Sequence, residues 1–477
     1  MGGCAIACLL ALFSREIGST APRVFALALV WLVAWPTRWA VGGERTFPVM
    51  FLEQLLILAP ALACCLVFAI LAQWPELQEL LRGIFPGLCR QDALLLLLDT
   101  APVTFSVLTA VLLLGRGTCA LVGMLSGMTL SILSGFRLEP LAMAMAATVT
   151  YLSKGHKDGY RFRTRSRVRR VSFWTILALF VVTGILLQTH GSPSKELALA
   201  YLVADVASAV GGTFVALLLL PVFERMTRLC TDITLGALAD LENPLLYRLS
   251  MECPGTYHHS VIVSHLARDA AEAIGANGLL ARVIAYYHDI GKLQHPAYFA
   301  ENNINQPSPH DALSPNQSRM YIVSHTIDGL VLGRDANLPQ PVLEAIQQHH
   351  GTSVIRAFYE KAVQNSQQAD PPDSPPINEA HFRYPGPKPS TRENAILMLS
   401  DITEAALRSK TNITPADVPA TIDALVATVI ADGQLDACPL TFREIAVIRR
   451  TLANTYTNFA HRRAAYPSPP EPKPSVP

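Results

Sequence analysis

Long runs of apolar residues dominate the first part of the chain and end near Phe223. A helix that crosses a hydrocarbon core of about 30 Å needs about 20 mostly apolar residues. Runs of roughly that length lie at 54–73, 93–114, 117–135, 171–188 and 197–223, and less regular ones lie at 5–13, 24–41 and 140–153. The pattern predicts a membrane bundle of roughly six or seven spans, and we expect no cleaved signal peptide because a basic leading segment is missing.

A strongly basic segment at 154–170 sets the expected orientation of this bundle. It contains two lysines and six arginines against a single acid, Asp158. Basic loops tend to stay in the cytoplasm, and two predicted spans follow this one. The chain after Phe223 is therefore expected on the cytoplasmic side of the inner cell membrane. Contact with anionic lipid headgroups is compatible with the same segment, whereas the flanking apolar runs disfavour a disordered nucleic-acid-binding arm.

Two carboxylates, Asp99 and Asp205, fall inside predicted spans. Such residues are costly in a membrane and often serve ion or ligand sensing. Packing inside the bundle against a hydroxyl side chain is the interpretation that we favour for both.

Composition narrows the class of protein further. Charged residues make up 16% of the chain and hydrophobic residues 51%, whereas about 25% charged residues is typical of a soluble domain. The 38 basic and 37 acidic residues nearly balance, so DNA or RNA polymers are not expected as partners. The nine cysteines form no CxxC pair, which argues against a zinc ribbon, a thioredoxin-type motif and a disulfide framework.

Past Phe223 the sequence resembles that of an ordinary soluble protein. From 224 to 249 apolar residues recur at mostly helical spacing, and Pro244 is expected to end that pattern. We expect a transmembrane region at 1–223, a helical connector at 224–250, a cytoplasmic domain at 251–462 and a disordered proline-rich tail at 463–477. The expected fold class is all-α, a multi-span helical membrane bundle followed by an all-helical cytoplasmic domain.

Histidines crowd into one part of the predicted cytoplasmic domain. Nine of the thirteen lie between positions 258 and 350, and histidine is the commonest metal ligand. His288 and Asp289 follow an amphipathic helix, which is expected to stop at Gly291 in a left-handed cap. Adjacent residues on a helix point about 100° apart, so this pair can address two neighbouring points in one site.

Other predicted helices carry the same residue types on otherwise apolar segments. One begins near 259 and ends around Gly275, a second covers 342–350 and precedes Gly351, and a third covers 395–407. Imidazole with carboxylate suits an open site for iron, manganese or zinc, and the absence of cysteine argues against a closed structural zinc site. The further candidate ligands are His259, His325, His349, His350 and Asp401.

Each of these motifs alone has an ordinary structural interpretation. A single His-Asp pair is more often a helix cap or a surface pair, and a histidine doublet is more often structural or exposed. Together the motifs favour a metal centre. Spacing does not separate His258 from His259 as the ligand, and His265, His295 and His310 are expected around the ligands or on the surface.

Five short motifs of this domain resemble one known family. They are Pro-Gly-Thr-Tyr-His-His-Ser at 254–260, Tyr-His-Asp-Ile-Gly-Lys at 287–292, Ser-Pro-His-Asp at 308–311, Gln-Gln-His-His-Gly at 347–351 and Arg-Tyr-Pro-Gly-Pro-Lys-Pro at 383–389. In this order they are similar to the cytoplasmic domain of the seven-transmembrane HD-domain family, the PgpH-type cyclic-di-AMP phosphodiesterases. The resemblance covers about residues 224–409 closely and the membrane half in architecture only.

The resemblance implies a phosphodiesterase with two divalent ions, iron or manganese, that hydrolyses cyclic-di-AMP to linear pApA. It selects His259 over His258 and implies that Asp289 bridges the two ions. The remaining ligands that it implies are His288, His325, His349, His350 and Asp401.

Three more residues are expected to meet the substrate. Lys292, one position past the HDIG glycine, is placed to neutralise charge on the phosphate and is expected to take part in catalysis. Arg383 and Tyr384 are candidates to contact phosphate or to stack on adenine.

The chain departs from the family pattern at two points. His258 stands where a glutamine is expected, which can alter the metal preference. The extracytoplasmic sensor domain usual after the first span is not expected, because only about fifty residues precede the strong spans.

Several alternatives stay open at this point. An HD-type hydrolase of another nucleotide and a catalytically silent membrane sensor or scaffold both fit the motifs. Hydrolysis of cyclic-di-GMP is disfavoured because no Gly-Tyr-Pro follows Gly351, and a transporter is disfavoured because no inverted repeat is visible. The expected partners are a cyclic dinucleotide and the lipid bilayer, and a homo-oligomer is compatible with the sequence.

Overall fold

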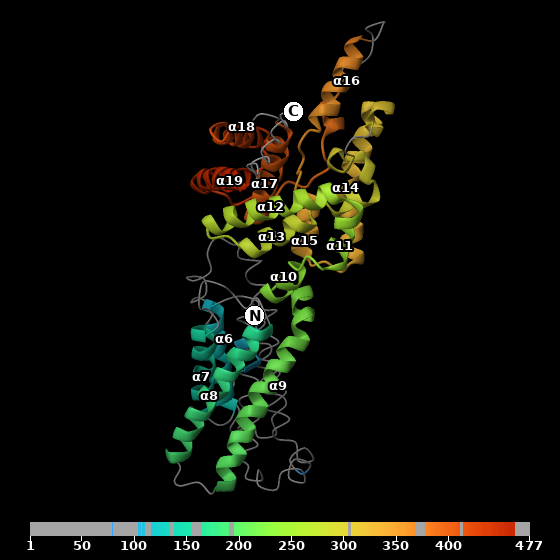
Figure 1. The fold of residues 1–477 in the computed structure, drawn as a ribbon. Helices are drawn as coiled ribbons and strands as arrows, with labels where there is room; N and C mark the ends of the chain where they lie inside the picture. The colour runs from blue at the N-terminus through green and yellow to red at the C-terminus, as the bar shows by residue number, and fades with distance from the viewer. Residues whose placement is uncertain are drawn as a thin grey trace, which may run out of the picture. The chain divides into compact units, whose positions relative to one another are not determined.

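The computed structural model describes residue 79 and residues 104–105, 107–109, 116–133, 138–154, 165–189, 195–303, 307–368, 377–410 and 414–462. The chain divides into two compact units, Met1–Ile233 and Thr234–Pro477. Every named element in these described ranges is an α or 3₁₀ helix (Figure 1), and the β-type contact there is an isolated bridge between Val354 and Arg383. The predicted all-α fold class is therefore confirmed.

Consecutive helices of the first unit pack against each other. They are α6 (Arg116–Leu133), α7 (Glu139–Lys154), α8 (Arg165–Thr189) and α9 (Lys195–Thr227). Two segments, Val168–Gln188 and Tyr201–Met226, are long and apolar enough to cross a membrane. The predicted runs at 5–13, 24–41 and 54–73, most of 93–114, and Asp99 lie outside the described residues, so the number of spans stays a prediction.

Many large apolar side chains on α8 and α9 are exposed, and several polar side chains of the same helices are buried. Val181 and Phe214 are 58% and 66% exposed, whereas Thr175, Thr183 and Asp205 are buried. Asp205 on α9 accepts a hydrogen bond from the Thr183 hydroxyl on α8 at 2.7 Å, which agrees with the packing interpretation of this carboxylate. Large apolar side chains exposed along these helices suit a hydrocarbon surrounding better than water, and the residues buried between the helices are mostly apolar as well.

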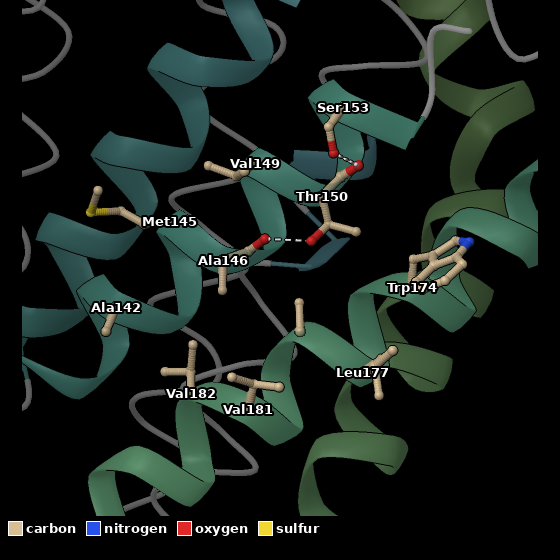
Figure 2. A pocket seen from close by; sticks show the side chains of 11 residues that line it. Ala142, Met145, Ala146, Val149, Thr150, Ser153, Trp174, Leu177, Val181 and Val182 are labelled. Carbon is tan, nitrogen blue, oxygen red and sulfur yellow. Dashed lines mark hydrogen bonds between the residues drawn. The ribbon is translucent and has the colours of Figure 1, made fainter.

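A groove of about 550 Å³ lies between α7 and α8. Figure 2 shows that Val149, Trp174 and Val181 line it. The hydroxyls of Thr150 and Ser153 donate to backbone carbonyls of their own helix at 2.8 and 3.3 Å. Hydroxyls that bond back to their helix have their polarity satisfied there, so the surface of the groove is mainly apolar.

The predicted basic loop at 154–170 is partly helical. The helix α8 begins at Arg165, so the last arginines of the segment lie in its first turns. Arginine is a good helix former. The start of the apolar run at Val171 therefore marked a change in polarity rather than the start of the helix.

The predicted connector is broken into short helices. After α9 come α10 (Asp232–Leu238) and α11 (Pro244–Glu252). Pro244 begins a helix instead of ending one, because proline lacks only an N–H that the first helical turn leaves unpaired. The side chain of Asn243 caps α11 by accepting from the Leu245 N–H at 3.1 Å.

The second unit is built around α12 (Pro254–Ala273), which packs against α11, α13, α17 and α19. The helix α12 begins five residues before the predicted position near 259, and the left-handed Gly275 follows its end as predicted. The proline-rich tail at 463–477 lies outside the described residues. The other helices are α13 (Gly278–Tyr287), η3 (Ile290–Gln294), η4 (Pro296–Tyr298), η5 (Ala300–Asn302), η6 (Pro309–Ala312), α14 (Pro315–Asp335), α15 (Gln340–Gln348), α16 (Arg356–Gln368), η7 (Glu379–Phe382), α17 (Arg392–Ser409), α18 (Asp417–Ala431) and α19 (Phe442–Arg462).

Candidate metal centre

The helix that precedes the HDIG motif is buried along most of its length. Asn277 caps the start of α13 by accepting from the Leu280 N–H at 3.1 Å. The helix ends at Tyr287, His288 is its C-cap, and the chain continues through Asp289 into η3. A helix anchored by so many buried residues gives the His-Asp pair a fixed position.

Gly291 is required here by a close contact between backbones and not by the left-handed cap that the sequence predicted. A Cβ at this position would lie 1.9 Å from the carbonyl oxygen of His325 and 2.5 Å from the amide nitrogen of Gly329, both on α14. Only glycine allows η3 and α14 to approach so closely. The approach places His325 Nε2 at 3.4 Å from Asp289 Oδ1.

The His349-His350 doublet lies in a turn just after α15. The helix ends at Gln348, and Gly351 follows the doublet with a φ of 52°, the left-handed geometry that favours glycine. The side-chain oxygen of Gln348 accepts a hydrogen bond from Asn394 Nδ2 of α17 at 2.8 Å. This bond fixes the turn against the helix that carries Asp401.

His259 and Asp401 meet across α12 and α17. His259 Nε2 lies 3.0 Å from Asp401 Oδ1, and its Nδ1 lies 2.5 Å from Glu404 Oε2. Asp401 and Glu404 are three residues apart on α17, so both carboxylates lie on one side of the helix. His258 is exposed whereas His259 is buried, which supports the choice of His259.

All seven predicted ligands are thus brought together, and they form two groups that share Asp289. The first donor group is His259, His288 and Asp289, and the second donor group is Asp289, His325, His349 and His350. Within each group the potential ligand atoms all lie within 4.8 Å of one another. Asp401 lies nearer to the first group, because its Oδ1 is 3.0 Å from His259 whereas its Oδ2 is 3.8 Å from His350.

Two buried atoms in this cluster show that it suits metal ions. In the described part of the chain, His288 Nε2 and Asp289 Oδ1 have no hydrogen-bond partner. Buried polar atoms without a partner are rare and need an explanation. A nitrogen lone pair and a carboxylate oxygen are both ligands that divalent metals accept, so the donors fit such ions.

The protonation of the cluster is set by burial and by its two carboxylates. Burial lowers the pKa of His325 to about 3, and burial with the neighbouring His349 lowers the pKa of His350. Burial also opposes charge on His288, but Asp289 and Asp401 outweigh it and raise the pKa of His288 to about 10. Without metal, this imidazole therefore holds a proton between two ionised carboxylates, and an ion that binds there displaces it.

Lys292 is buried beside the shared carboxylate. Its Nζ lies 2.7 Å from Asp289 Oδ2 and 2.7 Å from Glu301 Oε1. Burial opposes the ammonium charge, but the two carboxylates outweigh it and raise the pKa of Lys292. Glu301 also accepts from the Thr256 hydroxyl of α12 at 3.1 Å, so the lysine is held between η5, α12 and the HDIG turn.

Comparison with known proteins agrees with this geometry. Residues 256–406 match the HD domain family, and this range contains all seven clustered ligand candidates. This part of the chain is an HD domain.

Two curated proteins are similar to a larger part of the chain. The chain is 38% identical to the cyclic-di-AMP phosphodiesterase PgpH of Bacillus subtilis (strain 168) over 308 residues, 64% of this chain and 42% of that protein. It is 40% identical to the protein of the same name from Listeria monocytogenes serotype 1/2a over 294 residues, 62% of this chain and 39% of that protein. The chain therefore spans about two fifths of the length of these relatives.

A solved structure is also similar. It is the HD domain of L. monocytogenes PgpH in complex with cyclic-di-AMP, which is 44% identical and covers 46% of this chain and 99% of that one, with a TM-score of 0.43.

Arg383 has a full set of protein partners in the HD domain. Its guanidinium donates to Asp432 at 2.8 and 3.1 Å, to Glu379 at 2.7 and 3.1 Å and to the carbonyl of Thr352 at 2.8 Å. These bonds fix the loop before α17 to the end of α18. A substrate contact by Arg383 stays a prediction, and the geometry favours a structural role.

Tyr384 lies at the edge of the metal centre. Its ring stacks on His350 with centroids 4.3 Å apart and meets the edge of His325 at 6.1 Å. Burial raises the pKa of its hydroxyl. The side chain therefore borders the second donor group, which is compatible with the predicted substrate contact.

The sequence interpretation missed Glu301 and Glu404, which hold Lys292 and His259. A signal for Glu404 was present, because a second acid three residues after Asp401 on an apolar helix lies on the same face. Glu301 follows no periodic pattern. It reaches Lys292 only because η5 is folded against α12, where a Cβ on Gly255 would lie 1.9 Å from the Glu301 carbonyl oxygen.

Proposed function

We propose that this protein is a membrane-anchored phosphodiesterase with two divalent ions, iron or manganese, that hydrolyses cyclic-di-AMP to linear pApA. The observation that carries the proposal is the pair of donor groups that share Asp289. A carboxylate has two oxygens and can serve two ions at once, and its Oδ1 lies between His325 and His349 while its Oδ2 lies near His288.

The donor set suits a reaction on a phosphodiester. These donors would hold two ions, which would supply positive charge for the phosphoryl oxygens and for activation of water. Burial keeps His325 and His350 neutral in the second donor group, so neither repels an ion. The ligands carry two negative charges, from Asp289 and Asp401. Two divalent ions would carry four positive charges, so the occupied centre would have a net positive charge that attracts an anionic substrate.

Lys292 adds a fixed positive charge beside the shared carboxylate. An ammonium group has three donors, and Asp289 and Glu301 accept two of them. The third donor is available to a phosphate oxygen, which is the role proposed for this lysine. Tyr384 is proposed to contact a base at the open edge of the second donor group, next to His350.

The choice of cyclic-di-AMP rests on the relatives. Both curated PgpH proteins are named for this activity. The alternatives are hydrolysis of another nucleotide and a silent sensor, and the full set of clustered ligands disfavours the latter.

A bilayer position is proposed for the first unit. The large apolar side chains exposed on α8 and α9 support it, and so do the length and apolar composition of Val168–Gln188 and Tyr201–Met226. With the basic segment 154–170 on the cytoplasmic side, the HD domain would work in the cytoplasm.

The test is an assay of the full chain in detergent micelles, loaded with Mn²⁺ or with Fe²⁺ under anaerobic conditions. Cyclic-di-AMP, cyclic-di-GMP and pApA are offered separately, and the products are separated by chromatography. We expect pApA from cyclic-di-AMP and none from an Asp289→Ala variant. The matched control is Glu360→Ala, which changes an exposed acid of α16 outside the motifs. Preferential cleavage of cyclic-di-GMP, or cleavage of no dinucleotide, would contradict the proposal.

A further inference from the structure

The histidines of the centre differ in what holds the ring nitrogen that faces away from the ion sites. His288 Nδ1 donates to the carbonyl of Ala285 at 2.7 Å, and His325 and His349 donate in the same way to the carbonyls three residues before them, at 2.5 and 2.8 Å. A backbone carbonyl fixes the tautomer so that Nε2 faces the site. These three rings are therefore held by neutral groups.

His259 is held by a charged group instead. Its Nδ1 faces the carboxylate of Glu404 at 2.5 Å. Both side chains are only 3% exposed, so water does not weaken the interaction much. A carboxylate on the outer nitrogen orients a ligand histidine and makes its metal-binding nitrogen more basic.

Among the described residues, Glu404 has one other charged contact. Arg408 Nη1 lies 3.4 Å from the same oxygen, Oε2, one turn further along α17. The arginine side chain is 42% exposed, so its interaction is weak. Glu404 therefore acts mainly on His259.

The two donor groups differ in other ways that point in the same direction. Asp401 supplies the first group with a carboxylate in addition to the shared Asp289, whereas the second group has three imidazoles and Asp289 alone. His259 and His288 are almost completely buried, whereas the side chain of His350 in the second group is 23% exposed. More negative charge favours a bound cation, and lower exposure to solvent strengthens its attraction to the carboxylates.

We propose that Glu404 is a positioning residue that, through His259, makes the first donor group together with Asp401 the tighter of two unequal ion sites. The inference rests on the proposed two-ion centre and deepens it. It predicts that one ion stays bound when the other exchanges, and that the exchangeable ion is the one beside His350 and Tyr384.

The test is calorimetric titration of Mn²⁺ into the metal-free full chain in detergent micelles. We expect two binding steps of different affinity in the unchanged protein. Glu404→Gln keeps the side-chain size and an oxygen that can accept from Nδ1, but removes the charge. It should weaken the tighter step about 10- to 100-fold and leave the weaker step unchanged within about twofold. His350→Ala should remove the weaker step and leave the tighter one.

Glu393→Gln is the matched control, because this acid lies at the start of the same helix and accepts from the Asn277 N–H at 2.9 Å. It should change neither step. Arg408→Met gives a second test that leaves Glu404 in place. Loss of the competing cation should tighten the first step by about two- to fivefold.

The proposal is wrong if Glu404→Gln leaves both steps unchanged, or weakens only the step that His350→Ala removes. If Glu404 had only a structural role, Glu404→Gln would lower the melting temperature of the metal-free protein without selectively weakening one Mn²⁺ binding step. This result would also overturn the proposal. If the Glu404→Gln protein does not fold, weakening of the first step by Arg408→Met overturns the proposal. Asymmetric Mn²⁺ binding without cleavage of any cyclic dinucleotide would instead contradict the proposed function.

Discussion

Each of the two units contains a buried carboxylate with one oxygen that lacks a hydrogen-bond partner in the described part of the chain, Asp205 Oδ1 and Asp289 Oδ1. Their surroundings differ. Asp205 accepts one hydrogen bond, from Thr183, among apolar helices. Asp289 lies within 3.8 Å of ring nitrogens from four histidines and 2.7 Å from the Lys292 ammonium.

The comparison shows that burial of a carboxylate does not by itself make a reactive site. A lone carboxylate with a hydroxyl partner can join two helices. Chemistry requires convergence of further donors, which the HD domain achieves by bringing together α12, the turn after α13, α14, the turn after α15 and α17. The following predictions test this difference.

Asp289→Ala removes the shared ligand and should have the largest effect. We expect phosphodiesterase activity to fall by more than about 100-fold. Loss of a residue that only supports a metal ligand typically costs about 10- to 100-fold, and loss of a ligand itself should cost more. The assay on cyclic-di-AMP measures it, and bound manganese per chain should fall at the same time. Activity within tenfold of the unchanged protein would show that Asp289 is no more essential than Asp205.

Lys292→Gln removes the cation that faces Asp289 and Glu301. We expect kcat to fall about 10- to 100-fold, the range that mutagenesis gives for a residue supporting a metal ligand, with a smaller change in KM. Glu301→Gln keeps the contact to Thr256 and should have a smaller effect in the same direction. A rise of kcat in either variant would contradict this account.

Metal affinity should increase with pH, because an ion has to displace the proton on His288. The pKa of this histidine is about 10 without metal, so the proton is present throughout the neutral range. Each proton that the ion displaces makes Mn²⁺ binding about tenfold tighter per pH unit. Burial opposes charge on His259, but Asp401 and Glu404 outweigh it and raise the pKa of His259 too, which adds to the effect in the same direction. Titrations at pH 6, 7 and 8 measure this, and affinity independent of pH would show that His288 is already neutral.

Arg383→Ala distinguishes a structural from a substrate-binding arginine. Loss of its bonds to Asp432 and Glu379 should lower the free energy of unfolding by about 1–2 kcal/mol, as measured by denaturant titration. KM for cyclic-di-AMP should change by less than about threefold, a difference under 1 kcal/mol. A tenfold rise in KM at unchanged stability would restore the substrate-binding interpretation.

Asp205→Asn should have the smallest effect. Asparagine retains an oxygen that accepts from Thr183, so activity and metal content should stay within about twofold and stability within about 1 kcal/mol. Thr183→Val, which leaves the carboxylate without its donor, should cost more, about 1–3 kcal/mol. A large loss of activity in Asp205→Asn would mean that the first unit contributes chemistry.

The sequence predicted helices and the members of the cluster better than it predicted contacts. Histidine and aspartate on otherwise apolar helices marked the candidate ligands, because residue type and helix periodicity are local signals. The choice of His259 over His258 rested on the family resemblance. The predicted role of Gly291 as a left-handed cap was wrong. Its actual role is the close contact between η3 and α14, which depends on how these two helices approach each other. Glu301 was missed for the same reason.

Helix boundaries were misjudged where local polarity and helicity differ. The apolar run begins at Val171, but α8 begins at Arg165. Arginine favours helix formation, so the helix extends beyond the apolar run into the basic segment. A proline such as Pro244 can follow the end of one helix or begin the next. The cap by Asn243 shows that it begins α11.

The central claim is that seven side chains hold two ions bridged by Asp289. It is tested most directly by equilibrium dialysis of the full chain against Mn²⁺ at a concentration that fills both binding steps, with manganese per chain measured together with the electron paramagnetic resonance spectrum. The account predicts two manganese ions per chain with a spectrum of two coupled ions, and loss of the coupling in Asp289→Ala. One ion per chain, or two that are not coupled, would contradict it.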